Sequence, residues 1–144
     1  MLDPFVKRFK IRESDGRTLL ENKISELCRL VIKTNKEVIV SSESSPKKSK
    51  YYNHPIIKWL YVVPKYPCSL SDLNFRNLKD FDGYSNHCPV IIAPLTATVL
   101  GAQIIEIHIT LDKSKNFIDN NVSFDYNEIV ELTKLIRHFE QIKI

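Results

Sequence analysis

Short apolar runs alternate with amphipathic stretches along most of the chain. The runs Val38–Val40 and Ile56–Val63 are continuous and rich in β-branched residues, as in strands buried on both faces. A further strand is predicted over Val6–Ile11. The stretch Gln103–Leu111 alternates from Ile105 onward and predicts a strand with one apolar and one polar face. Its apolar side chains are Ile105, Ile107 and Ile109, and its polar side chains are Glu106, His108 and Thr110.

The stretches between these runs have helical spacing. A helix is predicted over Thr18–Lys33, with Asn35 ending it in a left-handed conformation. A short helix capped by Ser71 or Asp72 runs to Lys79. Another runs to Leu100 and begins at Pro89, or nearer Ala93, because Pro94 would lie inside the longer helix. The last begins at Asp125, with Glu128 completing a capping box and a stripe of Ile129, Leu132, Ile136 and Phe139. Alternating strands and helices predict a parallel α/β sheet.

Composition excludes several classes of protein. The 144 residues suit one domain, and 43% hydrophobic with 26% charged residues is a globular balance. No apolar run reaches the length of a membrane span, and the N-terminus lacks an apolar signal region, so we expect a cytoplasmic protein. The three cysteines are odd in number and predict reduced thiols. A net charge of +4 is too small to indicate nucleic-acid binding, so no nucleic acid and no membrane are expected as partners.

Residue types that support chemistry follow the predicted strands. His87 follows a short strand, and His108 lies toward the end of the strand predicted over Gln103–Leu111, beside Glu106. Imidazoles are common ligands for divalent metals. Lys10, Ser14 and Ser41 also lie at strand ends, where ammonium and hydroxyl groups can hold a phosphate or carboxylate. Serines also follow strands simply because they favour turns, and isolated histidines are more often surface or core residues. Residue type alone therefore leaves both interpretations open.

Several motifs resemble those of the sialic acid synthases. Gly83–His87 is similar to the family's G-x-S-[DN]-H element, and Gly101–Asp112 to its G-A-x-x-I-E-x-H-x-T-L-D strand. Thr34–Ser41 resembles T-G-K-P-V-I-L-S, and Lys10-Ile11 resembles the start of K-I-A-S. The remaining matches are the Y-P pair at Tyr66-Pro67 and the D-x-x-x-S loop at Asp119 and Ser123.

This resemblance implies a (β/α)₈ TIM barrel, of which residues 1–144 would form a single partial domain. It would hold roughly the last five strands with shortened helices, and no antifreeze-like C-terminal domain. The implied activity is condensation of phosphoenolpyruvate with an N-acetylmannosamine-type sugar in nonulosonic acid biosynthesis, with Mn²⁺ or Mg²⁺ as cofactor. The implied site has His87 and His108 on the metal, Asp119 and Glu106 as catalytic groups, and Lys10, Ser14, Ser41, Ser85 and Tyr66 on the substrates.

A half-barrel would leave two strand edges exposed. We therefore expect a partner, either a separately encoded N-terminal half or a second copy in a homodimer. Val63, Glu43 and Val90 depart from the family's Asn and two Gly positions. These departures favour the alternative of a catalytically inactive remnant, or a binding or regulatory partner that keeps the half-barrel. A third possibility is an unrelated small α/β binding domain.

Overall fold

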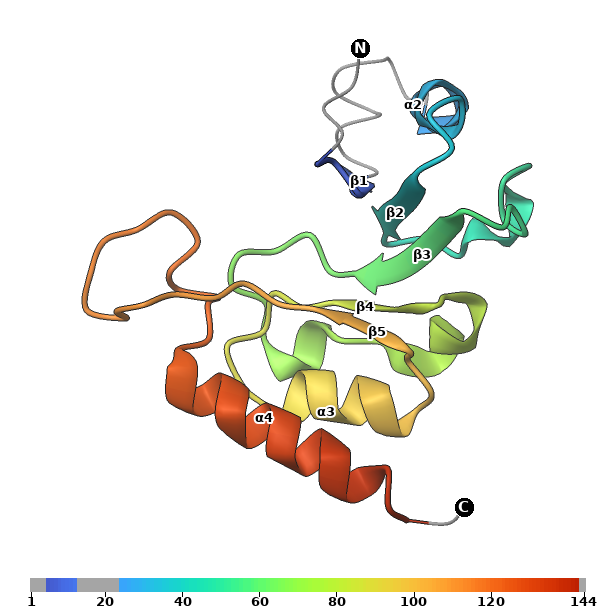
Figure 1. The fold of residues 1–144 in the computed structure, drawn as a ribbon. Helices are drawn as coiled ribbons and strands as arrows, with labels where there is room; N and C mark the ends of the chain where they lie inside the picture. The colour runs from blue at the N-terminus through green and yellow to red at the C-terminus, as the bar shows by residue number, and fades with distance from the viewer. Residues whose placement is uncertain (1–4, 13–23, 143–144) are drawn as a thin grey trace.

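The chain forms an open parallel sheet with helices along it, in a computed structural model that describes residues 5–12 and 24–142 (Figure 1). The sheet order is β1-β2-β3-β4-β5, and each neighbouring pair is parallel. This confirms the predicted α/β class and the five-stranded half-barrel. The strands are β1 (Arg8–Arg12), β2 (Glu37–Ser42), β3 (Ile57–Val62), β4 (Gly83–Ser85) and β5 (Ile104–Glu106). The α-helices are α2 (Ile24–Ile32), α3 (Ile92–Val99) and α4 (Tyr126–Phe139), and the 3₁₀ helices are η1 (Pro46–Lys48), η2 (Leu70–Asp72) and η3 (Phe75–Asp80).

The strand register gives the sheet two different faces. Side chains alternate along each strand, so residues paired across strands share a face. The face under α2 is apolar: Val38 pairs with Ile57 and Val40 with Trp59, and all four are buried. They pack with Ile11, Cys28, and the half-buried Leu27 and Val31 of α2. The opposite face carries polar residues toward the carboxyl ends of the strands, including Lys10 and Ser41.

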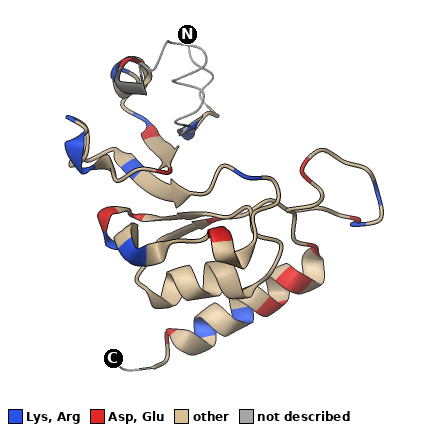
Figure 2. Cartoon of the chain, turned by 180° about the vertical axis from the view of Figure 1, so that it is seen from behind, with Lys and Arg blue, Asp and Glu red and all other residues tan. Residues whose placement is uncertain are grey.

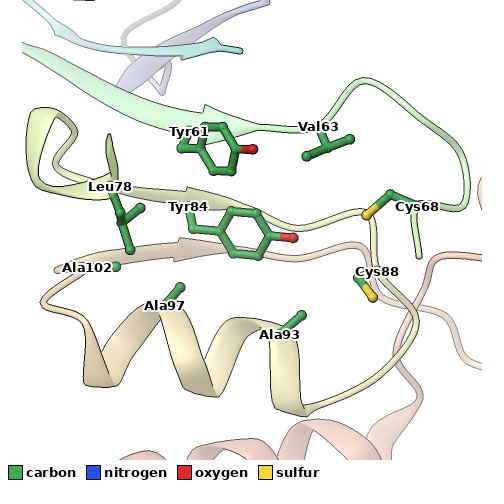
Figure 3. Packing of buried hydrophobic residues seen from close by; sticks show 9 residues of the cluster. All are labelled: Tyr61, Val63, Cys68, Leu78, Tyr84, Cys88, Ala93, Ala97 and Ala102. Atoms are coloured by element: carbon green, nitrogen blue, oxygen red, sulfur yellow. The ribbon is translucent and has the colours of Figure 1, made fainter. Parts of the chain in front are cut away.

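A second apolar cluster lies between the sheet and α3 (Figure 3). Tyr61 and Tyr84 come from neighbouring strands, and their rings stack with centroids 6.1 Å apart. Ala93 and Ala97 face them from α3, and such small side chains allow a helix to approach a sheet closely. The cluster is completed by Val63, Cys68, Leu78, Cys88 and Ala102.

Two helix boundaries match the sequence signals. Asn35 has φ 54°, the left-handed conformation predicted after α2. Asp125 caps α4 by accepting a hydrogen bond from the Glu128 N–H at 3.0 Å, and Glu128 bonds back to the Asp125 N–H at 2.9 Å. Leu132 is buried against the rest of the fold. The predicted residues Thr18–Lys23 lie outside the described residues.

Other predicted boundaries are wrong. The strand predicted over Gln103–Leu111 ends at Glu106, because its partner β4 ends at Ser85. Beyond that point the chain bonds to Phe124 instead, which donates its N–H to the carbonyl of His108 at 2.8 Å. The helix predicted to run to Lys79 is two 3₁₀ helices, η2 and η3. Asp72, in η2, accepts hydrogen bonds from the N–H and the hydroxyl of Ser69, the residue just before this helix. Such local side-chain bonds compete with a regular α-helix.

The remaining differences are small. Strand β1 extends to Arg12, one residue past the predicted end. Helix α3 begins at Ile92, close to the alternative start at Ala93 and not at Pro89. Pro94 therefore lies in its first turn, where proline's missing N–H costs little. Among residues 5–12 and 24–142, no helix is both long and apolar enough to cross a membrane.

Gly83 allows β4 and β5 to approach each other. A methyl group added at Gly83 would lie 1.9 Å from the carbonyl oxygen of Ile104, its register partner. Since that contact is with backbone, no side-chain rotation can relieve it. Any larger residue must therefore push the two strands apart.

We expect Gly83→Ala to lower the free energy of unfolding by at least about 1–3 kcal/mol, which is the typical cost of overpacking. Gly101→Ala is the matched control, because its methyl meets open space and only the positive φ of 100° opposes it. Urea denaturation of both variants checks this. An equal loss in the two variants would contradict the close strand contact.

The three thiols should be inert in the folded chain. Cys28, Cys68 and Cys88 are each at most 2% exposed, and burial raises the pKa of Cys28 and of Cys68 to about 11. Because the thiolate is the reactive form, a disulfide reagent at pH 8 should modify no thiol in the native chain and all three in denaturant. Rapid modification of any thiol in the native chain would show that these clusters are not packed as described.

Candidate functional site

The carboxyl ends of all five strands border one cleft with a volume of about 600 Å³. This edge is where parallel α/β sheets bind their ligands. The structure brings every sequence-predicted site residue except Ser14 into this cleft, and Ser14 lies outside the described residues. The predicted residues that line it are Lys10, Ser41, Tyr66, Ser85, His87, Glu106, His108 and Asp119.

Glu106 links the two ends of the sheet. Its Oε2 accepts hydrogen bonds from the Lys10 ammonium on β1 and the Ser85 hydroxyl on β4. Burial raises the pKa of Glu106, but the hydrogen bonds from Lys10 and Ser85 outweigh it and hold the pKa below its usual range. Glu106 is therefore ionised at neutral pH, and its charge is balanced by Lys10.

His87 is held in one tautomer by the backbone. Its side chain is buried, and its Nδ1 lies 2.8 Å from the carbonyl oxygen of Val63. A carbonyl can only accept, so Nδ1 carries the proton and Nε2 keeps its lone pair. Burial lowers the pKa of His87, although the Val63 carbonyl opposes this. The ring is therefore neutral, in the form that binds metals.

His108 lies beside His87, with the ring centroids 5.4 Å apart. Its Nε2 is 3.7 Å from Oδ2 of Asp119, and its Nδ1 is buried with no hydrogen-bond partner among the described residues. Asp119 has φ 60°, an uncommon conformation for a residue with a side chain. His108 therefore neighbours both the ring of His87 and the carboxylate of Asp119, but the described residues contain no group of three or more His, Cys, Asp or Glu side chains that could hold a metal ion.

Tyr66 covers the two histidines. Its ring lies 3.9 Å from the ring of His87 at a tilt of 33°, and 6.0 Å from that of His108, edge to face. Burial raises the pKa of Tyr66, whereas a hydrogen bond with the Arg12 side chain lowers it. Tyr66 thus connects the end of β1 to the histidine pair.

Sequence reasoning missed three contributions to the cleft. Arg12 and Glu43 also line it, next to the predicted Lys10 and Ser41. Their two-residue spacing from those positions was a usable signal, since alternate strand residues share a face. Val63 supplies its carbonyl to His87, while its side chain packs in the apolar cluster (Figure 3). A main-chain role of this kind leaves no trace in the sequence.

The cleft combines groups of complementary chemistry. Lys10, Arg12 and the strand-end hydroxyls of Ser41 and Ser85 can hold an anion. The two imidazoles can hold a divalent metal with open positions for other ligands. Among the residues that Figure 2 colours by charge, basic and acidic segments are interspersed, and neither sign dominates the view.

Comparison with known proteins identifies a matching family and several relatives. The NeuB family model matches residues 6–143. The N,N'-diacetyllegionaminic acid synthase of Legionella pneumophila is 30% identical over 153 aligned positions, which cover 95% of this chain and 42% of the relative. The pseudaminic acid synthase of Campylobacter jejuni (serotype O:2) is 28% identical over 127 positions, which cover 78% of this chain and 37% of the relative. The chain thus spans about two fifths of the length of these relatives.

A solved structure of a related synthetase also matches this chain. The N-acetylneuraminic acid synthetase of Leptospira borgpetersenii, crystallised in complex with citrate, superposes with a TM-score of 0.76 at 26% identity. The match covers 97% of this chain and 53% of that chain. Since the family model spans nearly the whole sequence and the fold agrees, the chain belongs to the NeuB family.

Proposed function

We propose that this chain carries the metal and donor half of a nonulosonic acid synthase, which condenses phosphoenolpyruvate with an N-acetylated amino sugar. The observation that carries the proposal is that two imidazoles, a lysine-bound carboxylate and strand-end hydroxyls converge in one cleft of a NeuB-family half-barrel. In the reaction, C3 of phosphoenolpyruvate forms a bond to the aldehyde carbon of the sugar. Water adds to C2 of the donor, and inorganic phosphate leaves with its bridging oxygen.

The donor would bind at the ends of β1, β2 and β4. Lys10, Ser41 and Ser85 offer an ammonium and two hydroxyls to its phosphate and carboxylate groups. Glu106 orients two of these groups through its hydrogen bonds to Lys10 and Ser85. Glu106 therefore fixes the donor groups before the substrate arrives.

His87 and His108 would hold a divalent metal, Mn²⁺ or Mg²⁺. Two observations support the fit: the carbonyl of Val63 fixes His87 with its Nε2 lone pair available, and Nδ1 of His108 is buried without a partner among the described residues. A bound metal would supply Lewis acidity that polarises the sugar carbonyl. With two protein ligands, positions remain for water and substrate.

The sugar would bind on the Asp119 side of the cleft. A second hollow of about 490 Å³ adjoins the first and shares Tyr66 and Asp119 with it. Lys113 and the amides of Asn116, Asn120 and Asn121 also line this hollow. Amide and carboxylate groups suit sugar hydroxyls, so Asp119 would orient the acceptor relative to the donor.

We also infer that catalysis needs the rest of a barrel. β1 and β5 lie at the two ends of the described sheet, and such edges readily pair with further strands. Those strands would come from a further segment or a partner chain, including a second copy. The alternative of a non-catalytic family member is favoured by Glu43, an exposed carboxylate that borders the proposed donor site.

Mn²⁺ should stabilise the chain through the histidine pair. A ligand at 100 times its Kd adds about 2.7 kcal/mol to the free energy of unfolding, so the melting temperature should rise by several degrees. His87→Ala and His108→Ala should lose this rise, whereas His138→Ala, at an exposed position on α4, should keep it. An equal rise in all four proteins would place the metal elsewhere.

The condensation should depend on Asp119 once the barrel is complete. We expect a mixture of this chain with the part of the Leptospira synthetase outside the matched region to release phosphate from phosphoenolpyruvate. The release should occur only when N-acetylmannosamine is present. Asp119→Ala should reduce this release at least 100-fold, while Asp125→Ala, which removes only the cap of α4, should leave most of it. Persistent inactivity of a folded, metal-binding mixture would favour the non-catalytic alternative.

A further inference from the structure

Asn86 is a buried polar residue between Ser85, the last residue of β4, and His87. Only 1% of it is exposed, and it is not among the residues that line the cleft. A primary amide has two N–H donors and an acceptor oxygen, and burying it without partners would destabilise the fold. The partners of this amide therefore indicate its role.

The Asn86 side chain reaches past His87 to the backbone of Cys88. Its Oδ1 accepts a hydrogen bond from the Cys88 N–H at 3.2 Å, and its Nδ2 donates one to the Cys88 carbonyl at 2.8 Å. The side chain of Cys88 is itself fixed, because it is buried in the apolar cluster beside α3 (Figure 3). The amide thus closes a short loop of backbone that has His87 at its centre.

The backbone of Asn86 is held as well. Its N–H donates to the carbonyl of Glu106 at 2.9 Å, which extends the β4–β5 pairing to the residue before His87. On the other side, the carbonyl of His87 accepts the N–H of Cys68 at 3.0 Å. The Asn86 amide therefore acts from a fixed base and joins the sheet to the apolar cluster.

The direction of the His87 ring depends on this loop. Nδ1 of the ring lies 2.8 Å from the Val63 carbonyl, and this bond selects the tautomer that keeps a lone pair on Nε2. A side chain turns with its backbone, so the ring keeps this bond only while the backbone of His87 keeps its position. Loss of the Asn86 amide would also remove two buried partners from the Cys88 backbone, which favours a rearranged loop.

We propose that Asn86 is a positioning residue for the metal site, whose amide holds the backbone around His87 so that the ring presents Nε2 to the cleft. The inference rests on the proposed function for the presence of a metal, whereas the orientation of the ring is independent of it. In this role Asn86 touches neither the metal nor the substrates and acts only through His87.

Two measurements on the full chain test this. Asn86→Leu keeps the volume but removes both hydrogen bonds, and Asn86→Ala removes them without an added apolar branch. In metal-free samples at pH 8, NMR spectra of the ring nitrogens of the four histidines should show His87 with its proton on Nδ1 in the wild type and as a mixture of tautomers in both variants. His87→Ala identifies its signals. Calorimetric titration with Mn²⁺ should give a Kd at least tenfold higher in both variants.

Two further variants separate positioning from a general loss of stability. Asn74→Leu is the matched control, because Asn74 accepts the Arg76 N–H at 3.2 Å at the cap of η3, outside the cleft. It loses the same type of bond, yet it should leave the tautomer unchanged and alter the Kd less than twofold. Asn86→Ser keeps one neutral acceptor for the Cys88 N–H, so its Kd should lie between those of the wild type and Asn86→Ala.

Three results would overturn the inference. An unchanged tautomer or an unchanged Kd in a folded Asn86→Leu or Asn86→Ala chain would mean that the amide does not position the ring. An equal loss in Asn74→Leu would assign the effect to stability. A Kd for Asn86→Ser as high as that for Asn86→Ala would exclude the bond to the Cys88 N–H as the cause. Thermal melts establish which variants are folded. If the wild type binds no Mn²⁺, the metal assignment of the proposed function fails, and the tautomer of His87 in the variants decides this inference alone.

Discussion

The site depends on one constraint: each strand from β1 to β5 pairs in parallel with the next. Because neighbouring strands run the same way, all their carboxyl ends meet at one edge of the sheet. The register then places Arg12 beside Ser41 and Ser85 beside Glu106. Residues nearly one hundred positions apart, such as Lys10 and Glu106, reach hydrogen-bonding distance only through this arrangement.

The site and the apolar cluster beneath it are parts of one structure. His87 bonds through its ring to the carbonyl of Val63 and accepts, at its own carbonyl, the N–H of Cys68 at 3.0 Å. The side chains of Val63 and Cys68 are buried in the cluster next to Cys88 (Figure 3). The packing of the core thus fixes the orientation and the neutral form of the histidine. Changes in this cluster would alter the site without touching the cleft.

Much of this arrangement was predictable from sequence, because short stretches of neighbouring residues indicate the strands, the helix caps and the motifs. β-branched runs identified β2 and β3, the capping box identified α4, and motif resemblance identified the residues that line the cleft. The extent of β5 was not predictable, since alternation continues to Leu111 while pairing stops where β4 ends. The two short 3₁₀ helices depend on bonds such as Ser69 to Asp72, which compete with a regular helix. Arg12 was missed because no motif contains it.

The charges in the cleft follow from the same geometry. Glu106 stays ionised because Lys10 and Ser85 donate to it, and His87 stays neutral because it is buried. An ionised carboxylate, a paired ammonium and a neutral imidazole therefore coexist within one cleft. This combination suits the proposed binding of an anion beside a metal.

The central claim is that ligands bind at the carboxyl edge of the sheet. Backbone amide shifts measured by NMR, as phosphoenolpyruvate and then Mn²⁺ are added to the labelled chain, test this most directly. The account predicts that the perturbed amides cluster at the ends of β1, β2, β4 and β5, around Arg12, Ser41, Ser85 and His108. Perturbations confined to the basic segment Lys47–Lys50 or to α4 would contradict it.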